Sequence, residues 1–217
     1  MPLPPHVTTV LLDIDGTLLD SNAAHAKAWA QALTEDGMVT AEATIRPLVG
    51  MGGDKLLPIV AHIEEKSDRG QALSKRKKAI FDTLLPGLQP TAGARPLVEF
   101  LRERGLEIVI ATSAGEDEVD GLLKRAGVDD LIPKRTSSDD VEDSKPDPDV
   151  VQAALARAKT TPDAAIFVGD TPYDVEAGLR AGVTVIAVRC GGYWPDGDFR
   201  DASAIENDPA SLLMLWR

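Results

Sequence analysis

With 217 residues, the chain is long enough to bury one well-packed domain with room for a modest insertion. Its 35 acidic residues against 23 basic ones give a net charge of −12 and no basic stripe, which argues against nucleic acid or an anionic membrane as a partner. No apolar run approaches the roughly 20 residues needed to span a bilayer. The start, MPLPPH, lacks the features of a signal peptide, and the one cysteine, Cys190, is compatible with a reducing compartment, so we expect a cytoplasmic protein.

The stretch around residue 13 combines a predicted buried strand with a pair of carboxylates. Residues 7–12, VTTVLL, are typical of a strand buried on both faces of a parallel sheet. Asp13 and Asp15 follow at its carboxyl end, where open α/β sheets bind their ligands, and Gly16 lets the backbone turn close to a bound group. Neighbouring carboxylates repel each other unless they share a proton or a cation, and their oxygens suit magnesium. An isolated D-x-D pair, however, is more often only a turn.

The region that follows, roughly residues 18–86, is predicted to be helical and shows no convincing strand. Apolar residues recur at helical spacing, and glycine or proline marks several of the expected ends. The expected helices are residues 22–36, 40–50, 54–65 and 74–85. The glycine-rich sequence GMGGDK, residues 50–55, separates the second of these helices from the third.

From residue 91 onward, predicted helices and strands alternate. The expected strands are residues 107–111, 131–135, 164–168 and 184–188. The expected helices are residues 95–104, 117–126, 147–158, 171–181 and 208–216, with Asp147 as an N-cap and Pro148 in the first helical position, and residues 191–201 are expected to form a loop. This alternation predicts βαβ units and a parallel sheet.

Polar residues follow three of these strands. Thr112 and Ser113 come after the second strand, where a hydroxyl and free backbone N–H groups can hold phosphate oxygens, although such residues are usually turn formers. Lys145 lies in the sequence SKPDP after the third strand, and a lysine in an acidic loop is usually just a solvated charge. Asp170 and Asp174 lie in GDTPYD after the fourth strand. A capping box at the start of the next helix would give Asp174 a structural role, but it gives none to Asp170.

Taken together and in their order along the chain, these sequence motifs resemble those of a known family. The sequence DIDGTLLDS, residues 13–21, closely resembles the first motif of the haloacid dehalogenase (HAD) superfamily in its magnesium-dependent phosphatase form, DxDGTLxDS. Thr112, Lys145 and the GDTPYD sequence are similar to the second, third and fourth motifs. The chain is identified as a member of the branch that includes phosphoglycolate phosphatases and β-phosphoglucomutases. This implies an α/β, Rossmann-like core made of residues 1–17 and 87–217, and an inserted helical cap made of residues 18–86.

The resemblance also implies a mechanism. Asp13 would attack the phosphorus of a small phosphorylated metabolite to give an aspartyl-phosphate, and Asp15 would act first as the acid and then as the base. Thr112 and Lys145 would hold the phosphoryl group and offset its charge. A bound Mg²⁺ would be held by the carboxylates of Asp13 and Asp170 and by the backbone carbonyl of Asp15. Asp174 would support these metal ligands.

Substrate contacts are expected from the cap and from the second motif. The candidates are His25, Arg46, the loop from Gly50 to Gly53, Lys55, Thr112 and Ser113. For His25 the alternative interpretation is a structural role in its helix, and for Arg46 and Lys55 it is a solvated surface charge. We expect a monomer or a homodimer.

Two other functions are considered. A sugar phosphomutase of the β-phosphoglucomutase type must hold a second phosphate, and that family does so with a lysine-containing stretch just after the second motif. Here that stretch is Gly115-Glu116-Asp117-Glu118, whose acidic side chains would repel a second phosphate. A phosphate-sensing regulator that uses the aspartate pocket as a switch would lack a helical insertion of this size.

Overall fold

The computed structural model describes residues 2–217 and contains, within them, a six-stranded parallel sheet. The strands lie in the order β3-β2-β1-β4-β5-β6, and every neighbouring pair is parallel. Their bounds are β1 (Thr9–Leu12), β2 (Glu107–Ala111), β3 (Lys134–Thr136), β4 (Ala165–Gly169), β5 (Thr184–Val188) and β6 (Ala204–Glu206). The predicted α/β fold class is therefore confirmed, and β6 is a strand that the sequence did not reveal.

Helices cover both faces of the sheet, which explains why its strands are apolar throughout. Side chains alternate along each strand, so that Leu11 faces one hydrophobic cluster while Val10 and Leu12 face the other. The first cluster also takes residues from α7 (Asp149–Ala158) and α8 (Pro172–Arg180). The second takes residues from α5 (Ala94–Glu103), α6 (Glu116–Ala126) and α9 (Pro209–Trp216).

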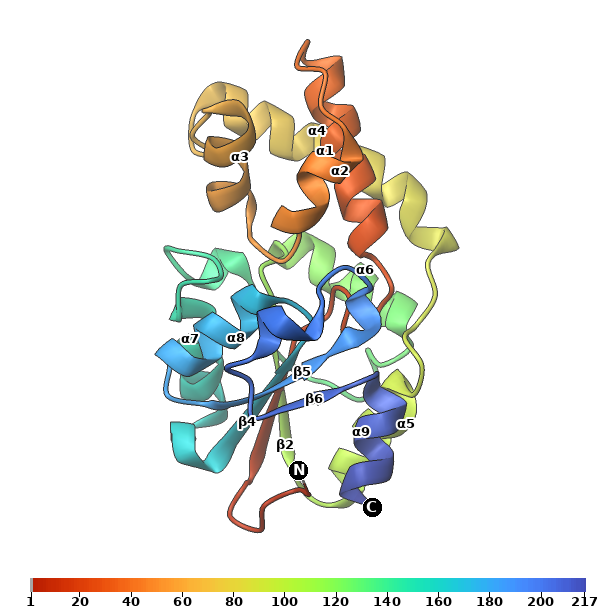
Figure 1. Cartoon of the computed structure of the whole chain (residues 1–217), viewed down its shortest axis with the longest axis vertical. Coiled ribbons are helices and arrows are strands. Elements are labelled where there is room, and N and C mark those ends of the chain that lie inside the picture. The colour runs from red at the N-terminus through yellow and green to blue at the C-terminus, as the bar shows by residue number, and fades with distance from the viewer. Residues whose placement is uncertain (1) are drawn as a thin grey trace.

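Of the helices between β1 and β2, the first four α-helices form an insertion that lies beyond the carboxyl ends of the strands (Figure 1). They are α1 (Asn22–Glu35), α2 (Glu42–Ile45), α3 (Gly53–Ala61) and α4 (Asp68–Leu84). They have a hydrophobic cluster of their own, to which α1 contributes Trp29 and Leu33 and α3 contributes Leu56 and Leu57. Within residues 2–217, none of the helices is long and apolar enough to cross a membrane.

Several predicted element bounds were wrong for local reasons. The expected helix at residues 40–50 is the short α2 followed by a 3₁₀ turn at Arg46–Leu48, where Pro47 lies in the first turn. The last inserted helix, α4, starts at Asp68 rather than residue 74, because the Ser67 hydroxyl caps it by accepting from the backbone N–H of Gly70. Pro148 is the N-cap of α7 rather than its first residue.

Candidate active site

The loops that follow β1, β2, β3 and β4 converge at one edge of the sheet. Asp13 directly follows β1, and its backbone N–H donates to the carbonyl of Val168 in β4 (3.0 Å). Thr112 follows β2, Lys145 comes from the loop after β3, and Asp170 follows β4. Parallel strands present their carboxyl ends at the same edge, so this topology brings together residues more than 150 positions apart in the sequence.

Lys145 lies between two carboxylates at the centre of the site. Its Nζ is 2.6 Å from Asp13 Oδ1 and 2.7 Å from Asp174 Oδ1, and the lysine side chain is 1% exposed. Burial alone would lower the pKa of Lys145, but the charges of Asp13 and Asp174 raise it above its ordinary value. The lysine is therefore a fixed positive charge held against Asp13.

Three buried carboxylates, those of Asp13, Asp170 and Asp174, each place an oxygen within 4.8 Å of the others. Burial raises the pKa of Asp13 to about 7; the charges of Asp174 and Asp15 also raise it, while Lys145 opposes them. Burial, followed by the charges of Asp174 and Asp13, likewise raises the pKa of Asp170 well above its usual range. Carboxylates that crowd together in this way, with hard oxygen donors, form a cluster that can hold a metal ion.

Asp170 is oriented by contacts from the first motif and from the residue that follows it, Asn22. The amide of Asn22 donates to its Oδ2 (2.7 Å), and the hydroxyl of Thr17 donates to its Oδ1 (3.2 Å). Gly16 has φ +81°, and a Cβ there would lie 2.2 Å from Asp170 Oδ2. Glycine is therefore required at this position, both for the turn and for the close approach of Asp170.

Asp174 does two things with its two oxygens. Its Oδ2 accepts from the backbone N–H (3.0 Å) and the hydroxyl (2.6 Å) of Thr171, which forms the capping box at the start of α8. Its Oδ1 faces Lys145. The structural and the functional interpretations of Asp174 are thus both compatible with its geometry.

Asp15 is held by contacts from the start of the inserted helices. Its Oδ1 accepts from the hydroxyl of Ser21 (2.5 Å) and lies 2.8 Å from His25 Nε2. The His25 ring stacks on Phe81 of α4, with ring centroids 4.0 Å apart. Although burial on its own raises the pKa of Asp15, the contacts with His25 and Ser21 lower it to about 2. These two contacts therefore favour the ionised form of Asp15, which is the form that can accept a proton.

A cavity of about 640 Å³ lies between the inserted helices and the sheet edge. Asp13, Asp15, Thr112 and Ser113 all line it. Thr112 is buried and its Oγ1 accepts from the backbone N–H of Ala114 (3.1 Å), whereas the buried Oγ of Ser113 has no hydrogen-bond partner. A hydroxyl without a partner on a residue that lines this cavity is suited to bind a polar ligand atom.

The predicted substrate contacts of the inserted region divide into two groups. His25 and the loop from Gly50 to Gly53 line the cavity. Among residues 2–217, the lining does not include Arg46 or Lys55. Arg46 instead donates to the carbonyl of Gly191 (2.7 Å), and Lys55 forms ion pairs with two aspartates of the loop before α7, Asp143 (2.6 Å) and Asp147 (2.9 Å).

Several residues of the site were missed by sequence reasoning. The hydroxyl of Ser144 accepts from the backbone N–H of Gly52 (2.9 Å) and donates to Asp54 (2.5 Å). These two hydrogen bonds join the start of α3 to the loop that carries Lys145. Asn22 was not singled out, although it directly follows the first motif. Lys77 and Glu118 both line the cavity, but a lysine-rich helix face and an acidic helix start carry no local signal of a contact between them.

Comparison with known proteins identifies the family. Residues 10–188 match the family described as haloacid dehalogenase-like hydrolases, and the chain belongs to it. A hydrolase from Pseudomonas syringae has a crystal structure that superposes with a TM-score of 0.88 at 31% identity, over 95% of this chain and 96% of that one.

Two relatives with phosphatase names are similar over most of the chain. A "phosphorylated carbohydrates phosphatase" from Thermotoga maritima is 27% identical over 178 residues, which are 80% of this chain and 81% of the relative. A "phosphoglycolate phosphatase" from Pseudomonas putida is 30% identical over 188 residues, which are 84% of this chain and 69% of the relative.

Proposed function

We propose that this protein is a phosphatase that hydrolyses a small phosphorylated metabolite through an aspartyl-phosphate on Asp13. The observation that carries the proposal is the pairing of Asp13, which lines the cavity, with the buried Lys145. A carboxylate held against a fixed positive charge can accept an anionic phosphoryl group that it would otherwise repel. The names of the relatives from Thermotoga maritima and Pseudomonas putida support the same activity.

In the first step, an oxygen of Asp13 attacks the phosphorus, and the bond between phosphorus and the ester oxygen breaks. Asp15 donates to the leaving oxygen the proton that it took from water in the preceding turnover, so the alcohol departs neutral. In the second step, water attacks the phosphorus of the aspartyl-phosphate while Asp15 takes its proton. The bond to Asp13 breaks, and inorganic phosphate is released. His25, which contacts Asp15 at 2.8 Å, positions that carboxyl group for both transfers.

The residues around Asp13 supply the remaining charge and orientation. Lys145 offsets negative charge on the phosphoryl oxygens, and the hydroxyls of Thr112 and Ser113 donate to them. Asp13, Asp170 and the backbone carbonyl of Asp15 would hold Mg²⁺, with Asp174 as a further carboxylate beside them. When bound, Mg²⁺ supplies positive charge at the phosphoryl group.

Residues 18–86 act in this proposal as a cap over the catalytic core of residues 1–17 and 87–217. Lys55 and Arg46 join the cap to the core rather than contacting substrate, while His25 and Gly50 face the substrate. A cap that closes over the cavity excludes water until the substrate is in place.

A phosphomutase function is the alternative. It requires a site for a second phosphate, and the stretch after Thr112 offers Glu116, Asp117 and Glu118 where a cation would be needed. Conversion of β-glucose 1-phosphate in the presence of a bisphosphate activator would distinguish a mutase from a phosphatase.

The experiment that tests the proposal is phosphate release from a panel of small phosphate esters, including hexose phosphates, glycerol phosphate and phosphoglycolate. It is run with magnesium and with a chelator, on protein shown to be folded by circular dichroism. Release that depends on magnesium is the expected result. No release from any ester would overturn the proposed function.

A further inference from the structure

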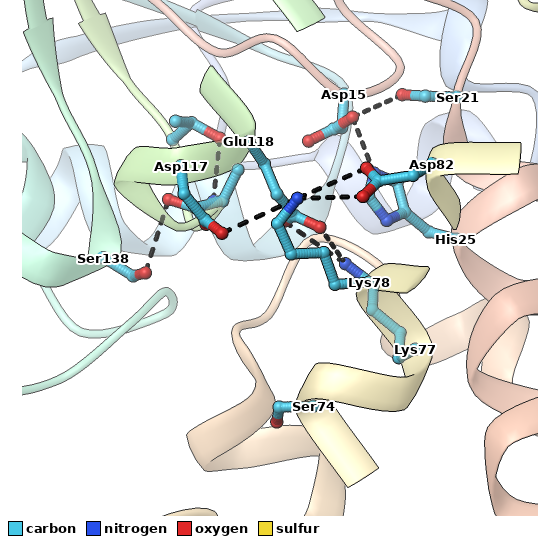
Figure 2. A network of polar contacts seen from close by, with 12 residues as sticks. Asp15, Ser21, His25, Ser74, Lys77, Lys78, Asp82, Asp117, Glu118 and Ser138 are labelled. Atoms are coloured by element: carbon cyan, nitrogen blue, oxygen red, sulfur yellow. Dashed lines mark hydrogen bonds and ion pairs between the residues drawn. The ribbon is translucent and has the colours of Figure 1, made fainter. Parts of the chain in front are cut away.

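An ion pair crosses the cavity wall between the cap and the core. Lys77 of α4 donates from its Nζ to both carboxylate oxygens of Glu118 in α6, at 3.1 and 3.3 Å (Figure 2). The two side chains are 11% and 9% exposed, and both residues line the cavity. Because the pair is shielded from water, each charge depends on the other for compensation.

Lys77 is also close to the reacting end of the cavity. Its Nζ lies 5.2 Å from the centroid of the Phe81 ring and 5.9 Å from that of Trp29. Phe81 in turn stacks on His25, the residue that contacts Asp15. Without Glu118, Lys77 would therefore be an unpaired ammonium group in the cavity wall, and such a group attracts a second anionic group on a ligand.

Of the other lysines in the cavity lining, Lys66 and Lys75 are exposed to solvent, which screens their charges. The lining contains eight acidic residues and four lysines, and Lys78, next to Lys77, is itself paired with Asp82 (3.1 Å) and Asp117 (3.6 Å). The cavity beyond Asp13 and Lys145 is thus negative on balance. An anionic tail on the substrate would meet repulsion there rather than a partner.

We propose that Glu118 sets substrate specificity by neutralising Lys77, so that the site takes phosphate monoesters whose remaining part is an uncharged polyol or sugar and rejects esters with a second anionic group. This inference rests on the proposed phosphatase function. A carboxylate or second phosphate that approached Lys77 would have to share it with Glu118 at close range. Phosphoglycolate and bisphosphates are accordingly poor substrates.

The test compares two esters that differ only in a carboxylate: glycerol 3-phosphate and 3-phosphoglycerate. The wild type is expected to have a kcat/KM at least about tenfold higher for glycerol 3-phosphate. Glu118→Gln keeps the size of the side chain and releases Lys77, so it shifts the ratio of the two kcat/KM values about tenfold toward 3-phosphoglycerate. Lys77→Met shifts the ratio in the opposite direction, because it leaves Glu118 unpaired.

The matched control is Glu116→Gln, which makes the same chemical change at an exposed position in the same helical turn. It should leave the ratio within about twofold of the wild type, since screening by solvent weakens an exposed charge. An unchanged ratio in Glu118→Gln, or an equal shift in Glu116→Gln, would overturn the role of Glu118 while leaving the phosphatase intact. If the wild type released phosphate from neither ester nor from any other, the proposed function itself would fail.

Discussion

Substituting alanine for Gly191 should weaken metal binding without straining the backbone. Gly191 ends the 3₁₀ turn Arg189–Gly191 and does not need a left-handed backbone conformation. A Cβ at this position would lie 1.7 Å from Asp170 Oδ2 and 2.9 Å from the amide nitrogen of Asn22. Because real contacts of this kind stay beyond 3.0 Å, the carboxylate of Asp170 must move by about 1.3 Å.

A displacement of that size acts on a residue that we propose as a metal ligand. Loss of the groups that orient metal ligands typically lowers metal affinity by about 10–100-fold, which corresponds to about 1.4–2.7 kcal/mol. We therefore expect the magnesium concentration for half-maximal phosphate release to rise by about 10–100-fold in Gly191→Ala.

The assay is phosphate release against magnesium concentration at a fixed, saturating ester concentration. Gly197→Ala is the matched control, because it lies in the same loop region and its added Cβ meets nothing within 4 Å. The control should titrate like the wild type. If Gly191→Ala folded normally and showed the wild-type magnesium dependence, the placement of Asp170 as a metal ligand would be refuted.

Two further predictions concern lysines that the structure places in different roles. Lys145→Met leaves Asp13 and Asp174 without their shared cation, so kcat at saturating magnesium should fall by at least about 100-fold; a rate within tenfold of the wild type would contradict the role of Lys145. Lys55→Met breaks the partly exposed ion pairs that Lys55 forms with Asp143 and Asp147. Because exposed ion pairs are weak, urea titration should show that the free energy of unfolding falls by less than about 1 kcal/mol. The KM for the ester should rise several-fold, because in our proposal the inserted helices then close over the cavity less often. An unchanged KM would show that Lys55 does not hold the cap.

The fold could be predicted where the sequence carries a strong local pattern. The strands β1, β2, β4 and β5 are apolar on both faces, and each is followed by turn or capping residues, so their places are clear from the sequence. By contrast, β6 is a half-buried edge strand of only three residues, too short to show a pattern. The early start of α4 was missed because its first turn is polar and includes Gly70, and the cap at Ser67 decides its position.

The sequence predicted those parts of the site whose positions follow from the order of the strands in the sheet. Asp13, Asp170 and Lys145 follow strands of one parallel sheet, so their convergence follows from the βαβ pattern. The direction of a side chain on the inserted helices does not follow from that pattern, because it depends on how these helices pack above the sheet. Thus Lys55 could be named as a cation but not assigned to Asp143, which lies 88 residues away.

The most direct test of the account is phosphate release by Asp13→Asn, measured beside the wild type with magnesium and the ester that the wild type prefers. The substitution keeps the size of the side chain and removes the nucleophilic carboxylate, so the protein should fold and release should fall to the background rate. Release by folded Asp13→Asn at a rate comparable to the wild type would show that Asp13 does not carry the phosphoryl group and would contradict the proposed mechanism.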